Sequence, residues 1–284
     1  MKAPPFAYVK AESIEQVFDL LLQYGDRARI LAGGQSLLAA LNLRLSAPEL
    51  LIDITALSSM GDIALQGETV RVGALVTHTE LERSAVIARH VPLLSQAVRH
   101  VAHVAIRNVG TFGGSIALAD PAAEYPACAM ALGATFTLAS KNGKRRVAAR
   151  EFFTGLYETA LQQGEVLIAG EFPAHSADER TTFLELARRH GDYAIIGVAA
   201  RARMDECRFA DARLAFFGVG DKPVLAVRAG AAVEGRAAGP EAIAAAQAAL
   251  ATELHPAADL HTSASAKVHL AKVLTSRALT ALAS

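Results

Sequence analysis

The residues ILAGGQSLL, at positions 30–38, decide the local fold because they place two consecutive glycines between a strand and a helix. Residues 29–31 form a short apolar run that predicts a strand entering the glycine pair. Residues 37–45 then predict one or two helical turns, and residues 50–54 predict a second apolar strand. The sequence therefore predicts a β-α-β block that ends near residue 60.

A second glycine pair lies within GTFGGS at residues 110–115, and each pair is followed by a serine, Ser36 or Ser115. Glycine reaches positive φ and lets a ligand approach the main chain closely. Successive amides then converge on an anion, so two facing turns would bind both phosphates of a pyrophosphate without a lysine. The alternative is that both pairs are only tight turns at strand ends. Neither pair matches the Rossmann or P-loop fingerprint.

The rest of the chain mixes hairpins and helices, which predicts an α+β fold. Two hairpins are predicted, at residues 63–75 and 135–148, and the second turns at Asn142-Gly143. Two further strands are predicted at residues 195–204 and 213–218. Helix starts are predicted from capping pairs or proline at Ser13 with Gln16, Thr79 with Glu82, Pro92, Asp120 with Pro121, and Pro240.

Composition excludes several classes of function. The 28 basic and 28 acidic residues cancel, and no basic patch is visible, which argues against nucleic acid and anionic membranes as partners. Cys128 and Cys207 are too few to ligate an iron–sulfur cluster or a structural zinc. We expect both to be buried thiols, with a disulfide between them left open. The chain shows no signal peptide or membrane span, so a cytoplasmic location is expected.

Four stretches in order resemble a known family. They are residues 30–38 with 42–45 (NLRL) and 51–54 (LIDI), residues 106–115 (IRNVGTFGGS) with 120–124 (DPAAE), residues 152–155 (FFTG), and residues 188–194 (RRHGDYA). Together the chain resembles the FAD-binding (medium) subunits of the xanthine dehydrogenase and carbon monoxide dehydrogenase family of molybdenum hydroxylases. The resemblance covers essentially the whole chain.

The resemblance implies a two-subdomain FAD-binding domain of the PCMH type, like that of vanillyl-alcohol oxidase. It would span residues 1–175, with subdomains of about 1–60 and 61–175. A smaller α+β C-terminal domain of molybdenum hydroxylase flavin subunits would follow at 178–284, after a polar boundary near residues 173–182.

The resemblance also implies a set of residues that bind FAD non-covalently. The two glycine loops would clasp the pyrophosphate, and Asn108, Ser115 and Asp120 would line the ribityl and flavin-ring end. Tyr193 would lie near the ring. The implied residues are Ala32, Gly33, Gly34, Gln35, Ser36, Leu37, Asn108, Thr111, Gly113, Gly114, Ser115, Asp120 and Tyr193.

Simpler roles remain open for some of these residues, and no residue is assigned a catalytic or metal-binding role. Asp120 would serve equally as a helix cap, and Tyr193 as a core tyrosine. His78, His100 and His103 are interpreted as satisfied polar residues, because their spacing forms no zinc pattern. Glu185 stands where many relatives carry a lysine, and a carboxylate there would disfavour an anionic reduced flavin.

The function implied is that of an electron-transfer subunit, active only within a complex. Electrons would come from 2Fe–2S clusters on a small partner, fed by a molybdenum–pterin centre on a large partner, and would leave through FAD to an external acceptor. A doubled heterotrimer is expected. Two alternatives stay open: a flavin- or nucleotide-binding module without redox duty, and a stand-alone FAD reductase.

Overall fold

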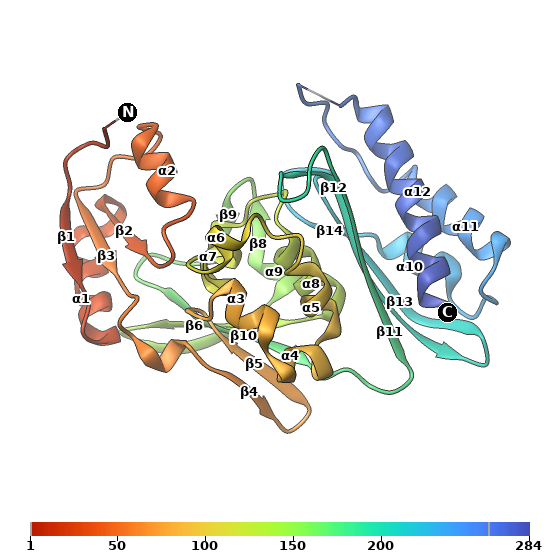
Figure 1. Cartoon of the computed structure of the whole chain (residues 1–284), viewed down its shortest axis with the longest axis horizontal. Coiled ribbons are helices and arrows are strands. Elements are labelled where there is room, and N and C mark those ends of the chain that lie inside the picture. Colours follow the sequence, from red (N-terminus) through yellow and green to blue (C-terminus); the bar gives the residue numbers. More distant parts are fainter. Residues whose placement is uncertain (1, 261) are drawn as a thin grey trace.

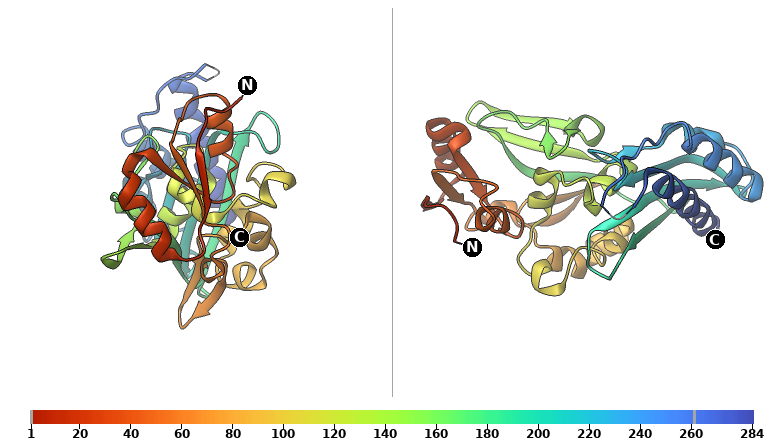
Figure 2. Two further views of the ribbon diagram at one scale, coloured as in Figure 1. Left: turned by 90° about the vertical axis from the view of Figure 1, so that its left-hand side faces the viewer. Right: turned by 90° about the horizontal axis from the view of Figure 1, so that it is seen from above.

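The computed structural model describes residues 2–260 and 262–284 and shows three lobes in a row along the longest axis of the molecule (Figure 1). The N-terminal lobe lies at one end, and the C-terminal helices lie at the other. A view from above gives the same order (Figure 2). Each lobe has its own main sheet, so the fold is α+β as predicted.

The N-terminal lobe is a three-stranded parallel sheet in the order β1-β3-β2. Its central strand β3 (Leu50–Asp53) is buried throughout, between β1 (Ala7–Lys10) and β2 (Ala28–Leu31). Helix α1 (Ile14–Tyr24) begins at Ser13, whose side chain accepts from the Gln16 amide, as predicted. The remaining elements are η1 (Gly25–Arg27), α2 (Leu37–Asn42) and η2 (Ser58–Met60).

The middle lobe is a five-stranded antiparallel sheet in the order β4-β5-β10-β6-β7. Both predicted hairpins are confirmed in it: β4 (Ile63–Gln66) with β5 (Thr69–Gly73), and β6 (Thr135–Ser140) with β7 (Gly143–Ala148). The other elements are β10 (Val166–Pro173), the short pair β8 (Phe153–Gly155) and β9 (Glu158–Thr159), and the helices α3 (His78–Arg83), α4 (Ala85–His90), α5 (Pro92–Ala97), α6 (Val104–Arg107), α7 (Phe112–Leu118), α8 (Glu124–Leu132) and α9 (Ala149–Phe152).

The C-terminal lobe is a four-stranded antiparallel sheet with helices on both faces. Its strands are β11 (Glu179–Ala187), β12 (Ala194–Asp205), β13 (Arg208–Phe217) and β14 (Val224–Leu225), and its helices are α10 (Val227–Val233), α11 (Pro240–Leu250) and α12 (Ala264–Leu282). Along β13, Leu214 and Phe216 face the C-terminal helices, whereas Ala215 and Phe217 belong to the core around α8. The sheet is therefore shared by two cores, because strand side chains alternate between faces.

Three local predictions were wrong. The capping box of α3 is formed by Thr77 and Glu80, because the Thr79 hydroxyl donates instead to Asn108. Helix α8 begins at Glu124, three residues after Pro121, since Asp120 instead accepts a hydrogen bond from the Ala122 amide and closes a turn. Cys128 is buried as expected, but Cys207 is exposed in the turn between β12 and β13.

Two further features concern the helices and the cysteines. No helix in the part of the chain that the structure describes is both long enough and apolar enough to cross a membrane. Both cysteines are free.

The shared sheet predicts a large cost for one core substitution. Phe217 is fully buried, and its ring stacks on Phe183 with centroids 5.6 Å apart. We expect Phe217→Ala to lower the free energy of unfolding by about 3–5 kcal/mol, because the cavity would open inside the core around α8. Urea unfolding measures this. Phe6→Ala, at a side chain 38% exposed, is the control and should change stability by about 0.5 kcal/mol or less. A loss below that of the control at Phe217 would contradict the shared core.

Candidate functional site

The first glycine loop presents a run of free backbone amides. None of the amides of residues 32–37 donates a hydrogen bond to another described residue, whereas Leu38 donates to the carbonyl of Gly34. Gly34 adopts a φ of +70°, which turns the chain from β2 into α2. The Gln35 side chain donates to the Gly33 carbonyl at 2.9 Å. This side-chain bond stabilises the loop and leaves the backbone amides of the loop free. Such a run of N–H groups is the donor arrangement that binds anions.

The two glycine loops touch each other at Gly33. A Cβ on Gly33 would lie 2.3 Å from the Val109 carbonyl oxygen and 2.7 Å from the Gly110 Cα. Only glycine fits, because the nearest atoms are backbone and have no rotamer to change. The prediction that the two glycine elements come together is therefore confirmed, and the contact joins the N-terminal lobe to the middle lobe.

The second glycine pair has a different role from the one expected of its amides. Gly113 and Gly114 lie in the first turn of α7, after the N-cap Thr111. The Gly113 amide donates to the Ala74 carbonyl at 2.9 Å, and the Gly114 amide donates to the Thr111 hydroxyl at 3.1 Å. A Cβ on Gly113 would meet the Ala74 Cβ at 2.5 Å. This pair therefore serves close packing of α7 against the chain that follows β5, rather than a second set of free amides.

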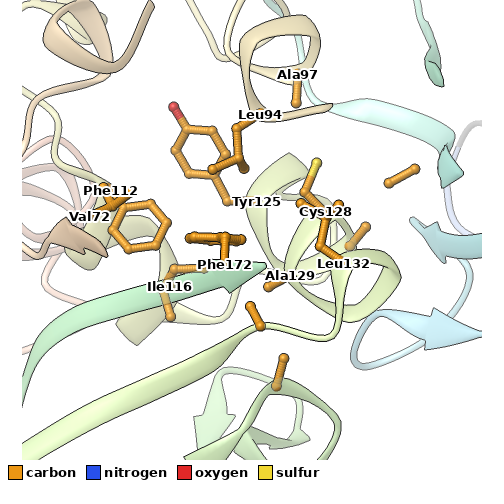
Figure 3. Close-up of a cluster of buried hydrophobic side chains, with 14 of the residues drawn as sticks. Val72, Leu94, Ala97, Phe112, Ile116, Tyr125, Cys128, Ala129, Leu132 and Phe172 are labelled. Atoms are coloured by element: carbon orange, nitrogen blue, oxygen red, sulfur yellow. The ribbon is translucent and has the colours of Figure 1, made fainter. Parts of the chain in front are cut away.

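His78 supports the second loop from behind. Its amide donates to the Gly110 carbonyl at 2.9 Å, and its ring would lie 2.8 Å from a Cβ on Gly110. The ring nitrogen Nδ1 lies 3.2 Å from the Tyr125 hydroxyl. Figure 3 shows Tyr125 between Leu94 and Phe112, with its hydroxyl directed out of the apolar cluster. Burial, and then the Arg107 charge, lower the pKa of His78 to about 4, so the ring is neutral. The interpretation of His78 as a satisfied polar residue is confirmed.

Asp120 forms a second cluster with two tyrosines. Its side chain is buried, accepts from the Ala122 amide at 2.9 Å, and lies 3.4 Å from the Tyr157 hydroxyl. The pKa of Tyr193 is raised, first by partial removal of its phenol from water and then by the charges of Asp120 and Glu124. Tyr193 as a residue is nevertheless 76% exposed, so it is not a core tyrosine.

Sequence reasoning missed Tyr157, although it follows the FFTG stretch by only two residues. Its pKa is also raised, by burial, by Asp120 and by Tyr193. The structure therefore brings residues 120, 157 and 193 together from three separate segments. The sequence feature that indicates Tyr157 is an aromatic residue close to Gly155. In the structure this segment is a turn, and Tyr157 has a φ of +54°.

The remaining predicted residues lie around the second loop. Asn108 ends α6 and accepts from the Thr79 hydroxyl at 2.7 Å. Ser115 lies one residue beyond Gly114 in α7, and its hydroxyl makes no hydrogen bond within the described residues. Leu37 is the first residue of α2.

Two other features of the described chain, its acidic and metal-ligating side chains and one surface cleft, do not indicate a binding site. No group of three or more histidine, cysteine, aspartate or glutamate side chains among residues 2–260 and 262–284 is arranged to hold a metal ion. A cleft between α1 and the β6–β7 hairpin is lined by Phe18, Met60 and Lys144, among others, and by no residue of the glycine loops. We give it no role, since its lining includes the exposed ion pair of Lys141 with Asp19.

Comparison with known proteins identifies both parts of the chain. Residues 4–175 match the FAD binding domain in molybdopterin dehydrogenase, and residues 181–282 match the CO dehydrogenase flavoprotein C-terminal domain. A relative, the 6-hydroxypseudooxynicotine dehydrogenase complex subunit alpha of Paenarthrobacter nicotinovorans, is 36% identical over 98% of this chain and 95% of that protein.

Solved structures match over the whole length. Carbon monoxide dehydrogenase from Hydrogenophaga pseudoflava, in a form that lacks the Mo-pyranopterin moiety of the molybdenum cofactor, superposes with a TM-score of 0.97 at 36% identity, covering 99% of this chain and 98% of that chain. Quinoline 2-oxidoreductase from Pseudomonas putida 86 gives a TM-score of 0.94 at 38% identity, covering 100% and 98%.

The buried neutral His78 predicts that the stability of the protein decreases as the pH is lowered. A folded-state pKa of about 4, against an ordinary 6.5, means that the unfolded chain binds the proton first. Stability from this group is complete above pH 6.5 and is lost as the pH falls toward 4, by about 3 kcal/mol in all. Urea unfolding between pH 7 and pH 4 measures the loss. His78→Phe removes the titrating ring, so the difference between the two proteins should shrink by that amount as the pH falls. A constant difference would contradict the neutral state.

Proposed function

We infer the function of this chain from the premise that it belongs to the FAD-binding medium subunits of the carbon monoxide dehydrogenase and xanthine dehydrogenase type of molybdenum hydroxylases. It is an FAD-dependent oxidoreductase subunit. We propose that it takes electrons from iron–sulfur clusters of a partner subunit and passes them to an external acceptor. FAD supplies the redox chemistry, which belongs to the cofactor itself.

The free amides of residues 32–37 carry the proposal for the phosphates. We propose that these neutral donors hold the FAD pyrophosphate, because successive amides beside a helix start suit an anion. Gly33 lies against Val109 and Gly110, so the second loop borders the same site. The residues proposed to bind FAD are Ala32, Gly33, Gly34, Gln35, Ser36, Leu37, Asn108, Thr111, Gly113, Gly114, Ser115, Asp120 and Tyr193. Gly113 and Gly114 contribute by close packing.

The cluster of Asp120, Tyr157 and Tyr193 supports a place for the flavin ring. Asp120 lies two residues after the end of α7, whose start carries the second glycine pair. Tyr193 exposes most of its ring, and an exposed aromatic residue at such a position covers a ring or admits a reaction partner. We add Tyr157 to the proposed set, because its hydroxyl lies 3.4 Å from the Asp120 carboxylate and orients it.

The partners follow from the family and from the chain's own cysteines. Two cysteines, one buried and one exposed, cannot provide the four ligands of a cluster. We propose that a small subunit carries 2Fe–2S clusters and a large subunit carries the molybdenum–pterin centre, in a doubled heterotrimer located in the cytoplasm. We further propose that residues 1–175 form the FAD-binding domain and residues 178–284 the C-terminal domain.

A spectral experiment tests the redox function. The purified full-length chain should carry about one FAD per chain, released by heat as free FAD because attachment is non-covalent. Its visible spectrum should bleach with dithionite and recover in air. A bound flavin that never bleaches would favour a binding module, and rapid NADPH oxidation by the chain alone would favour a stand-alone reductase. Each result would overturn the proposal.

One glycine substitution tests the phosphate site. We expect Gly33→Ala to lower FAD affinity by at least about 100-fold, because its methyl group pushes the first loop away from Val109. Equilibrium dialysis or flavin fluorescence measures the affinity. Gly220→Ala is the matched control, since nothing lies within 4 Å of a Cβ there. Unchanged affinity in both variants would contradict the placement of the pyrophosphate.

A further inference from the structure

A carboxyl group without a hydrogen-bond partner lies on β11 beside His100. Glu185, on β11, has a side chain only 3% exposed. Its Oε2 atom is buried and accepts no hydrogen bond from any described residue. An ionised carboxylate in such a place is costly, so the group responds by holding a proton. Burial accordingly raises the pKa of Glu185 to about 7.

Glu124 supplies a second carboxyl group close enough to repel the first. It is the first residue of α8. Burial raises its pKa to about 8, helped by the charges of Glu185 and Asp120. Ionisation of one carboxyl group disfavours ionisation of the other, so the two groups titrate as a pair rather than separately. We call Glu124 and Glu185 the buried acid pair.

His100 connects the buried acid pair to solvent. Its Nδ1 lies 3.9 Å from Glu185 Oε2, beyond hydrogen-bond distance but within reach of a small side-chain shift. The His100 side chain is 36% exposed and stacks on His190, with centroids 6.4 Å apart. Burial, and then the His190 charge, lower the pKa of His100. The titratable groups around the pair are therefore His100 and His190 near Glu185, and Asp120, Tyr193, Tyr125 and Cys128 near Glu124.

Glu124 links the pair to the proposed flavin end, because it follows Asp120 by four residues at the start of α8. The charge of Glu124 acts on Tyr193 together with that of Asp120. A negative charge arriving near Asp120 would therefore raise the proton affinity of the pair. We propose that Glu124 and Glu185 form a proton-storage site, loaded from solvent through His100, that takes up a proton when electrons enter the flavin. This rests on the proposed function.

The proton transfer balances in two steps. A solvent proton adds to the His100 imidazole, and the Nδ1–H bond then breaks as an O–H bond forms on Glu185. No electron passes through these residues, since the electrons come from dithionite in the test, or from the iron–sulfur partner in the complex. The stored proton offsets the negative charge added nearby. Glu124 and Glu185 act as positioning residues for that charge and not as catalytic residues.

The test measures protons rather than turnover. The full-length FAD-loaded chain is reduced at pH 7.5 in weak buffer with an indicator dye. We expect the wild-type chain to take up more protons per flavin than the E124Q/E185Q double variant, by up to about one proton. Infrared difference spectra should show a carboxylic-acid C=O band that grows on reduction and is absent from the double variant.

H100Q should slow the uptake without changing its extent. E151Q, at an exposed glutamate, is the control and should match the wild type.

The outcomes separate this proposal from the proposed function. Equal uptake and equal infrared spectra in a flavin-loaded wild type and double variant would overturn proton storage alone. A chain that binds no flavin would overturn the proposed function and redox-linked uptake with it. The acid pair itself is checked without flavin: its carboxylic-acid band should persist at pH 7 in the wild type and in E151Q. If the pH is raised from 5 and the band of the wild type has already disappeared at pH 6, the two carboxyl groups are ordinary and the pair is overturned.

Discussion

The contact of Gly33 with the backbone of Val109 and Gly110 is the constraint on which the site depends. It holds the first glycine loop, in the N-terminal lobe, against the second glycine loop, in the middle lobe. No side chain of Gly33 separates the two backbones. The first loop can then leave the amides of residues 32–37 free, because its contact with the second loop helps to fix its position without bonds from those amides. His78 and Tyr125 hold the second loop from the opposite side. The free backbone amides of the N-terminal lobe are therefore held in position by residues of the middle lobe.

Local patterns predicted local structure well. The Asn142-Gly143 hairpin and the capped helix at Ser13 form where expected, because turn and capping chemistry is decided by adjacent residues. Local reasoning failed where a distant partner intervened. Thr79 resembles a helix cap, but its hydroxyl is taken by Asn108, 29 residues away. Strand β1 lacks a strong pattern of its own and forms by pairing with β3.

The candidate site was predictable in its loops but not in its supports. The glycine pairs indicated two backbone elements that meet, and the structure has them in contact. Their chemistry differs, since the amides of Gly113 and Gly114 are already bonded within the chain. Tyr157 and Tyr193 reach Asp120 only through tertiary folding, and no spacing in the sequence relates residues 120, 157 and 193.

The helices of the C-terminal lobe cover only one face of the sheet of β11 to β14. Ala199, Ala215 and Phe217 are part of the core around α8, whereas Val198, Leu214 and Phe216 pack under the last helices. Cutting the chain before residue 181 would thus strip α5 and α8 of their apolar cover. We therefore expect the two segments that are matched as separate modules to unfold as one cooperative unit, since each provides apolar cover for the other.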